Sequence, residues 1–199
     1  MSFKSVITAL SVIGFSLSAW SGNLDTLKSE VTWTGSKVIG DSHVGNVKVK
    51  DGEVKYKNGE PTSANVVIDM TTITNNDLKD PKWNKKLVGH LNSDDFFSTN
   101  KYKTATLDAK SIKKASDKFY FVTGDLNIKG KSNPVKVKVE VVEDKKDYQV
   151  VKADFEFDRT KWGIQYNSGS FFSDLGDKMI ADEVKLSVKL HVKKDVKKK

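Results

Sequence analysis

Cysteine is missing from this chain, and histidine and proline are scarce. The 199 residues include no cysteine, three histidines and three prolines. Without cysteine there are no disulfides and no thiolate chemistry, so the fold must gain its stability from packing. A lipid-modified N-terminal cysteine is excluded for the same reason. Among exported proteins, this absence is more typical of a bacterial periplasm than of an animal extracellular space.

Motifs of the common enzyme classes are missing as well. There is no phosphate-binding loop, no dinucleotide fingerprint and no HExxH zinc motif, and Ser168 and Ser170 do not lie in a GxSxG elbow. Asp94 and Asp95 are adjacent, so their side chains should diverge instead of forming a catalytic carboxylate pair. We therefore expect no enzyme, no cofactor and no metal. One alternative stays open, a stress-response or metal-dependent enzyme that uses His90 and the nearby aspartates.

The chain also lacks a hydrophobic run long enough to cross a membrane. Its most apolar stretch, Val6 to Leu17, has about twelve residues, whereas a transmembrane helix needs roughly 20. Lys4 precedes this stretch, and small residues follow it. This order predicts a cleaved secretory signal peptide over 1–21 and export to the periplasm. Two pairs of small residues have the spacing that signal peptidase needs: Ser16 with Ser18, and Ala19 with Ser21.

Negative charge is in short supply. The chain has 26 acidic residues against 34 lysines and arginines, which gives a formal net charge of +8. Such a balance suggests nucleic acid as a partner. However, many lysines alternate with apolar residues, as on the wet face of a sheet, and others form a basic C-terminal tail over 193–199. We therefore expect no nucleic-acid binding, and a weak contact with an anionic membrane surface instead.

Alternation of apolar and polar residues is abundant, and it is the pattern of half-buried β-strands. In PVKVKVEVV, residues 134–142, alternate valines share one face and charged residues the other. Similar runs occur at 29–35, 63–70, 104–112, 117–130, 150–158 and 182–192. Turn signals separate the runs at Asp51-Gly52, Asn58-Gly59 and Lys129-Gly130. About eight strands with short turns predict an all-β antiparallel barrel or sandwich.

Residues 78–97 interrupt this pattern and predict a short helix. Asp80 can cap the helix, and Pro81 suits its first position, where no amide donor is needed. An apolar stripe then recurs every four residues at Trp83, Leu87 and Leu91.

The end of this helix decides how its polar residues are interpreted. Ser93 should break the helix, which separates His90 from Asp94 and leaves His90 with a structural hydrogen-bonding role. Phe96 and Phe97 follow in a short turn. We expect the helix and this aromatic pair to close one end of a barrel.

Five motifs in order carry a resemblance to a known family. They are VTWTGSKVIGDSHVG, IDMTTITNNDL, HLNSDDFFSTNKYKTATL, GDLNIKGKSNPVKVKVEV and FDRTKWGIQYNSG. Together they resemble the YceI-like family of bacterial periplasmic proteins over residues 24–192. The resemblance implies an eight-stranded antiparallel, lipocalin-like β-barrel with a helical excursion around 78–97. It also implies an apolar interior that binds a long-chain lipid, either a polyisoprenoid or a fatty-acyl compound, and it suggests a homodimer.

The interior of an eight-stranded barrel can hold one small ligand. We expect large apolar residues of the strands, loops and helix to contact that ligand. The candidates are Trp33, Trp83, Leu87, Leu91, Phe96, Phe97, Phe119, Phe121, Phe155, Trp162, Tyr166 and Phe171. The alternative is that such side chains fill the barrel completely, which would leave an interaction protein without a cavity.

Arg159 is the one charged candidate for ligand binding. Its planar fork of donors can anchor a lipid head group. The alternative, which we favour, is a salt bridge or backbone contact that fixes the turn after Asp158. Trp162 and Tyr166 follow closely, and such amphipathic aromatics suit the mouth of a barrel.

Overall fold

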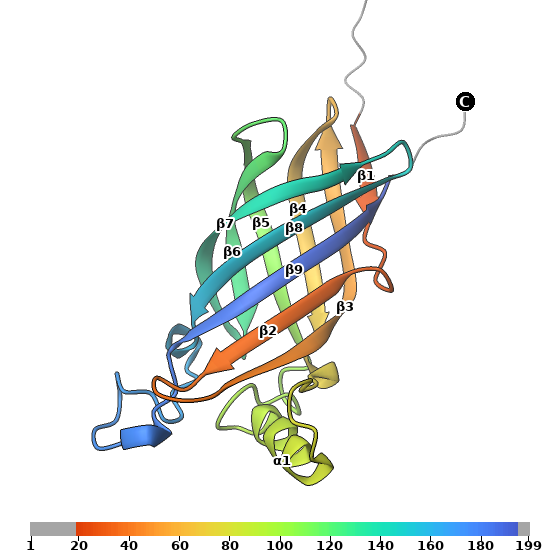
Figure 1. Cartoon of the computed structure of the whole chain (residues 1–199). Coiled ribbons are helices and arrows are strands. Elements are labelled where there is room, and N and C mark those ends of the chain that lie inside the picture. The colour runs from red at the N-terminus through yellow and green to blue at the C-terminus, as the bar shows by residue number, and fades with distance from the viewer. Residues whose placement is uncertain (1–18, 195–199) are drawn as a thin grey trace, which may run out of the picture.

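A computed structural model describes residues 19–194 of the chain, in which nine β-strands surround a common interior (Figure 1). The predicted signal peptide and basic tail lie mostly outside these residues. The strands are β1 (Ala19–Asn23), β2 (Glu30–Ser36), β3 (Ser42–Lys57), β4 (Glu60–Asp69), β5 (Thr104–Lys114), β6 (Phe119–Ile128), β7 (Lys131–Asp144), β8 (Tyr148–Asp158) and β9 (Glu183–Lys193). The helical elements are η1 (Met70–Thr72), α1 (Pro81–Asn92), η2 (Arg159–Trp162) and η3 (Gly176–Lys178).

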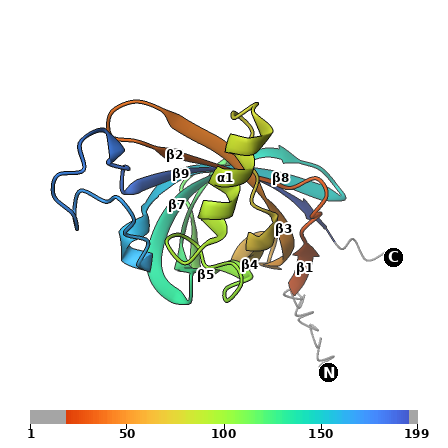
Figure 2. The same ribbon diagram turned by 90° about the horizontal axis from the view of Figure 1, so that it is seen from below.

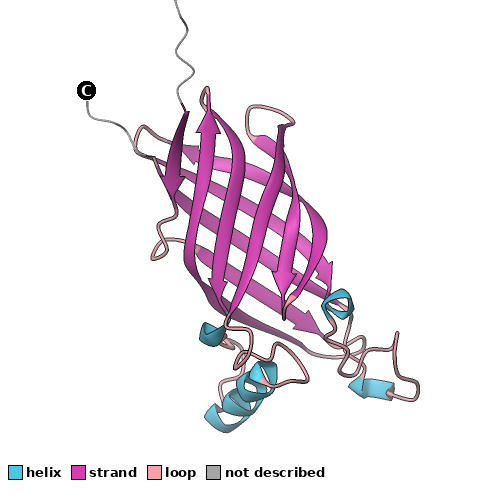
Figure 3. Ribbon diagram, turned by 180° about the vertical axis from the view of Figure 1, so that it is seen from behind, coloured by secondary structure: helices cyan, strands magenta, loops and turns pink. Residues whose placement is uncertain are grey.

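Eight strands close into an antiparallel barrel, as predicted. The hydrogen-bonded order is β3-β2-β9-β8-β7-β6-β5-β4, and β4 pairs again with β3 to complete the ring (Figure 3). The ninth strand, β1, lies in line with β2. β1 pairs with the second half of β3, through Asn23 and Glu53, whereas β2 pairs with the first half, through Val31 and Val47. Pairing is shortest between β7 and β8, where the register runs only from Glu140 opposite Lys152 to Asp144 opposite Gln149.

Turns and bulges explain how the sheet curves onto itself. The hairpins at Asn58-Gly59 and Lys129-Gly130 have positive φ at both residues, which matches the twist of antiparallel strands. The turn expected at Asp51-Gly52 is absent: β3 runs through it with a bulge between Val49 and Asp51. Gly52 is needed there because a Cβ would lie 2.5 Å from Leu24 and 2.7 Å from the Asn65 carbonyl oxygen. Bulges of this kind bend a strand and increase its twist.

The two ends of the barrel differ. α1 and the three η turns gather at one end, which we call the helical end (Figures 1 and 2). At the other end lie the β3–β4, β5–β6 and β7–β8 hairpins, and we call it the hairpin end. Within residues 19–194, no helix combines the length and the apolar character needed to cross a bilayer.

Candidate functional site

A chain of three apolar cavities runs through the barrel. The first lies at the helical end, the second in the middle and the third at the hairpin end, with cavity volumes of about 140, 110 and 100 Å³. Neighbouring cavities share wall residues: Ala105 and Leu126 belong to the first two, and Val66 and Leu107 to the second and third. The three therefore lie end to end along the barrel, whose interior is not completely filled by side chains.

The wall of this space follows from the alternation of the strands. The inward-facing residues of β9 all line it: Val184, Leu186, Val188, Leu190 and Val192. From β7, Val137 and Val139 on the inward face also line it. Small side chains keep the middle open. Ala105 of β5 and Ala153 of β8 stand where larger residues would narrow it. The interior is thus suited to a long, narrow and apolar ligand.

α1 covers the helical end much as predicted. The Asp80 carboxylate accepts hydrogen bonds from the backbone N–H groups of Lys82 and Trp83, at 2.8 and 3.2 Å, and Pro81 takes the first position. Leu91 is buried and lines the first cavity, and Leu87 packs against the same core. Trp83 is 53% exposed, which corrects its expected place in the lining. The first turn of α1 is thus exposed at Trp83 and its last turn is buried at Leu91, so the later turns cover the cavity.

The turn after α1 brings two phenylalanines to the cavity. Phe96 and Phe97 both line it. His90 supports them: its Nε2 lies 3.0 Å from an Asp95 carboxylate oxygen, and its ring packs edge-on against Phe96 at 4.9 Å. On its other side the His90 ring contacts Tyr166 at 4.6 Å. These contacts fit the structural role expected for His90.

No metal centre forms around these groups. Among residues 19–194, no three histidine or acidic side chains converge in a way that could hold a metal ion. Asp94, adjacent to Asp95, pairs instead with Lys101 at 2.9 Å.

Arg159 is buried, is part of the lining of the first cavity and is held by backbone groups. Its Nε donates to the Ala181 carbonyl at 3.0 Å, and its two Nη atoms donate to the carbonyls of Ile164 and Ile180 at 2.9 and 3.1 Å. Asp182 lies 3.4 Å away. Burial lowers the pKa of the guanidinium, and the neighbouring carboxylates oppose this shift. The contacts are those of the favoured alternative, in which Arg159 fixes the turn.

The aromatic candidates of the strands divide between interior and surface. Trp33 lines the first cavity and Phe155 the second. Phe119 and Phe121 are not part of the lining, which corrects the prediction for both. They lie out of phase with the inward residues of β6, and ammonium groups of Lys138 and Lys136 lie over their rings, at 4.1 and 4.9 Å. Both faces of this run are apolar, so its sequence does not show which face turns inward.

The aromatic candidates after β8 also take different places. Trp162 is 2% exposed, and its Nε1 donates to the Leu126 carbonyl at 2.9 Å. Its ring packs edge-on against Phe157 in the core, outside the cavity lining. Tyr166 is partly exposed at the helical end beside His90. Phe171 is half-exposed in the loop before η3 and does not reach the interior, which corrects its expected place. This loop projects away from the barrel (Figure 1).

Sequence reasoning missed the polar residues at the far end of the cavity. Tyr56, Tyr120 and Gln149 line the third cavity. The Tyr56 hydroxyl donates to Gln149 at 3.2 Å, and the Tyr120 hydroxyl donates to Glu60 at 2.8 Å. Burial, together with Glu60, raises the pKa of Tyr120 to about 12. The alternation of inward and outward residues could have identified both tyrosines, because Tyr56 lies two residues after the inward Val54 and Tyr120 two residues before the inward Val122.

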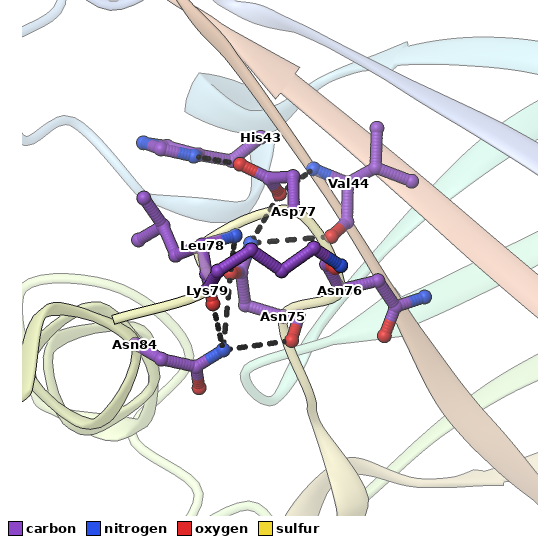
Figure 4. Close-up of polar contacts among 8 residues, drawn as sticks. All are labelled: His43, Val44, Asn75, Asn76, Asp77, Leu78, Lys79 and Asn84. Atoms are coloured by element: carbon purple, nitrogen blue, oxygen red, sulfur yellow. Dashed lines mark hydrogen bonds and ion pairs between the residues drawn. The ribbon is translucent and has the colours of Figure 1, made fainter. Parts of the chain in front are cut away.

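A second missed feature is a polar cluster that ties the approach to α1 onto β3 (Figure 4). Asp77 accepts from the Val44 backbone N–H at 2.8 Å, and its other oxygen lies 2.7 Å from His43 Nδ1. Asn75 donates to the Val44 carbonyl at 3.1 Å, and Asn84 of α1 donates to the Asn75 carbonyl at 2.9 Å. Partial burial opposes ionisation of Asp77, but the hydrogen bonds outweigh it and lower its pKa to about 2. The cluster holds the helix over the cavity.

Comparison with known proteins gives a consistent result. The family model for the YceI-like domain matches residues 23–192. The UPF0312 protein plu2095 of Photorhabdus laumondii is 30% identical over 147 residues, 72% of this chain and 71% of that protein. Protein YceI of Escherichia coli O157:H7 is 33% identical over 100 residues, which cover 49% of this chain and 48% of that protein.

Two solved structures share the fold. BcnA of Burkholderia cenocepacia is 26% identical, with a TM-score of 0.67 over 84% of this chain and 98% of that one. A domain from Saccharophagus degradans, described as polyisoprenoid-binding and implicated in plant cell wall breakdown, has a TM-score of 0.64. It is 14% identical and covers 90% of this chain and 99% of that one, a likeness of fold.

Proposed function

Because the chain belongs to the YceI-like family, we propose that it binds the hydrocarbon part of a long-chain lipid inside its barrel. The ligand would be a polyisoprenoid or a fatty-acyl compound. The observation that carries the proposal is the row of three adjoining apolar cavities between the two ends of the barrel. The polyisoprenoid-binding description of the Saccharophagus degradans domain, which has the same fold, supports it.

Burial of the hydrocarbon supplies the binding free energy. Each CH₂ group taken from water contributes about 0.8 kcal/mol, so a long chain needs few specific hydrogen bonds. The narrow space would select ligands by length and width. Such a ligand would contact Phe97 and Leu91 at the helical end, and Tyr56 and Tyr120 at the hairpin end, which line the first and third cavities.

We further propose that the protein acts by binding and carrying its ligand in the periplasm, after removal of a signal peptide. β1 bears on the site of cleavage. It begins at Ala19, and Trp20 stacks on Tyr56 with ring centroids 3.8 Å apart. Cleavage after Ser18 would keep this stack, whereas cleavage after Ser21 would remove it. We expect the first, and N-terminal sequencing of the protein from a periplasmic extract distinguishes the two.

Native mass spectrometry followed by organic extraction tests the lipid proposal. The purified protein should carry a long-chain lipid, and the extracted protein should take up isoprenoid or fatty-acyl ligands. Ala105→Leu adds bulk where the first two cavities meet and should lower uptake by roughly tenfold or more. Ala115→Leu, at an exposed hairpin, is the matched control. A protein without bound lipid that takes up neither ligand class would contradict the proposal.

A further inference from the structure

The side of α1 that faces away from the cavity carries three lysines and a tryptophan. Lys82, Trp83, Lys85 and Lys86, here called the α1 outer face, are all exposed. The Lys86 ammonium lies 5.0 Å from the centroid of the Trp83 ring. An exposed tryptophan beside lysines is the combination that helices use at a membrane interface, where the ring and the lysine stems meet the head groups.

The charge of this face is not neutralised by the protein. Within residues 19–194, Lys82, Lys85 and Lys86 make no ion pair, whereas other exposed lysines, such as Lys101 and Lys114, do. α1 itself contains no acidic residue. Asp80, the nearest acidic residue in sequence, directs its carboxylate to the first backbone N–H groups of the helix. The face is therefore complementary to an anionic surface.

Exposed apolar residues protrude from the same end of the barrel. Val38 and Ile39 form the tip of the β2–β3 hairpin, and Phe171 and Phe172 lie in the loop before η3; we call these four the apolar tips. The two segments are joined, because the Val38 N–H donates to the Met179 carbonyl at 3.0 Å. Figures 1 and 2 show both segments at the helical end, where they project to one side of α1. Grouped exposed apolar residues of this kind mark interaction sites.

We propose that the helical end docks on the surface of an anionic lipid bilayer. The α1 outer face contacts the head groups, and the apolar tips insert among them. Asp174 lies in the loop of Phe171 and Phe172, and Asp177 lies in η3, so this segment contributes apolar contact and α1 supplies the positive charge. A second copy of the chain fits less well, because it would bring two uncompensated lysine faces together.

Docking in this orientation places the entrance of the cavity at the bilayer. The first cavity lies directly behind Leu91, Phe96 and Phe97, on the inner side of the docked segment. A lipid leaving the membrane would therefore have a short path into the barrel. The docking proposal is independent of what the cavity binds, since it rests on the outer surface alone.

Vesicle co-sedimentation of the exported chain tests this proposal. Vesicles of phosphatidylcholine and phosphatidylglycerol in equal parts should bind the protein, vesicles of phosphatidylcholine alone should bind it far less, and added salt should weaken the binding. Replacing Lys82, Lys85 and Lys86 by glutamate should lower partition onto the anionic vesicles on the order of a hundredfold. The matched control replaces Lys57, Lys118 and Lys146, three exposed lysines of the hairpin end, by glutamate, with the same change of net charge.

The apolar tips are tested separately. Phe171→Ser with Phe172→Ser should lower the same partition roughly tenfold, whereas Phe121→Ser on the barrel wall should leave it unchanged. Equal losses in the two lysine sets, or no binding by the wild type, would overturn the proposal. The proposal would also be overturned if the protein did not bind vesicles but formed a concentration-dependent dimer that only the replacement of the α1 lysines abolished. Native mass spectra of each variant report the cavity ligand, so failure of docking and failure of lipid binding are distinguishable.

Discussion

At the scale of single residues, Arg159 is a charged side chain in the lining of an apolar cavity, and backbone carbonyls hold it there. Its donors are directed at three backbone carbonyls from two segments, 164 and 180–181, that would otherwise have no regular partner. A buried guanidinium is stable only when its donors are satisfied in this way. The residue therefore joins η2 to the segment that leads into β9.

We expect Arg159→Met to destabilise the protein by about 3 kcal/mol, because it leaves buried carbonyls unpaired. Arg159→Lys should recover only part of this loss, since an ammonium lacks the planar fork. Urea unfolding at neutral pH measures both. Lys161→Met, at an exposed position of the same turn, is the control and should lie within about 0.5 kcal/mol of the wild type. Equal losses at 159 and 161 would contradict this role.

Asp77 makes a pH-dependent contribution to stability. Its pKa is lowered from 3.8 to about 2, so the folded state favours the charged form. The contribution is present above pH 3.8 and is lost as the pH falls through about 2. After allowance for solvent screening, we expect it to be about 1 kcal/mol.

Unfolding of Asp77→Asn across this range tests the prediction. The wild type should be more stable than the variant at neutral pH, and the difference should shrink between pH 3.8 and about 2. Asp41→Asn, in the neighbouring hairpin, removes one exposed charge and should follow the wild type. A difference between wild type and Asp77→Asn that stays constant down to pH 2 would show that the hydrogen bonds do not depend on the ionised carboxylate.

At the scale of elements, α1 has an inner face that packs on the barrel and an outer face that is exposed to solvent. Its inner residues, Leu87 and Leu91, pack over the barrel, and its outer residues remain available to a partner. The sequence predicted the limits of the helix because capping is local: Asp80, Pro81 and Ser93 act within a few residues. The sequence did not show that Trp83 is exposed while Leu87 and Leu91 are packed on the core, since all three belong to one apolar stripe. Only the position of the barrel under the helix decides which part of the stripe is buried.

The turn after α1 gives the prediction that belongs to this scale. Phe97→Ser should weaken lipid retention by about tenfold, because it removes a large apolar contact from the cavity wall. His90→Ala should weaken lipid retention much less, since His90 packs against Phe96 and Tyr166 and is not itself part of the cavity lining. Displacement of a fluorescent fatty-acyl probe measures both, with Phe121→Ser as a surface control. A larger loss of lipid retention in His90→Ala than in Phe97→Ser would contradict this prediction and would indicate a functional role for His90.

At the scale of the whole molecule, the barrel joins two properties that are separate in the sequence. The interior is apolar along its length, while the lysines that alternate with its valines face water. The two ends then differ in chemistry, with a lysine-bearing helix and apolar tips at one and hydrogen-bonded tyrosines at the other. A ligand inside would therefore meet a different environment at each end, and entry at the helical end follows from the proposed docking.

Local patterns were enough for most of the fold. Alternation identified the strands other than β1 and β3, together with the inward faces of β7, β8 and β9, and hairpin residues identified the turns at 58–59 and 129–130. The pattern was insufficient in β6, where both faces are apolar near Phe119 and Phe121, and at Asp51-Gly52, where a turn pair lies within a bulged strand. In both places the neighbouring strand decided the outcome, because pairing with it fixes which face of the strand points inward and which residues lie opposite each other.

By itself, the sequence determined the all-β class, the helix and its caps, and the apolar character of the interior, since each depends on residues close together in the chain. The tertiary structure alone decided that the barrel keeps an open space, that Arg159 binds backbone, and that His43 meets Asp77 across 34 residues. These depend on how side chains from distant strands share a volume. Packing of that kind has no local signature, because replacing one small wall residue, such as Ala105, by a larger apolar residue would narrow the space without changing the alternation of apolar and polar residues.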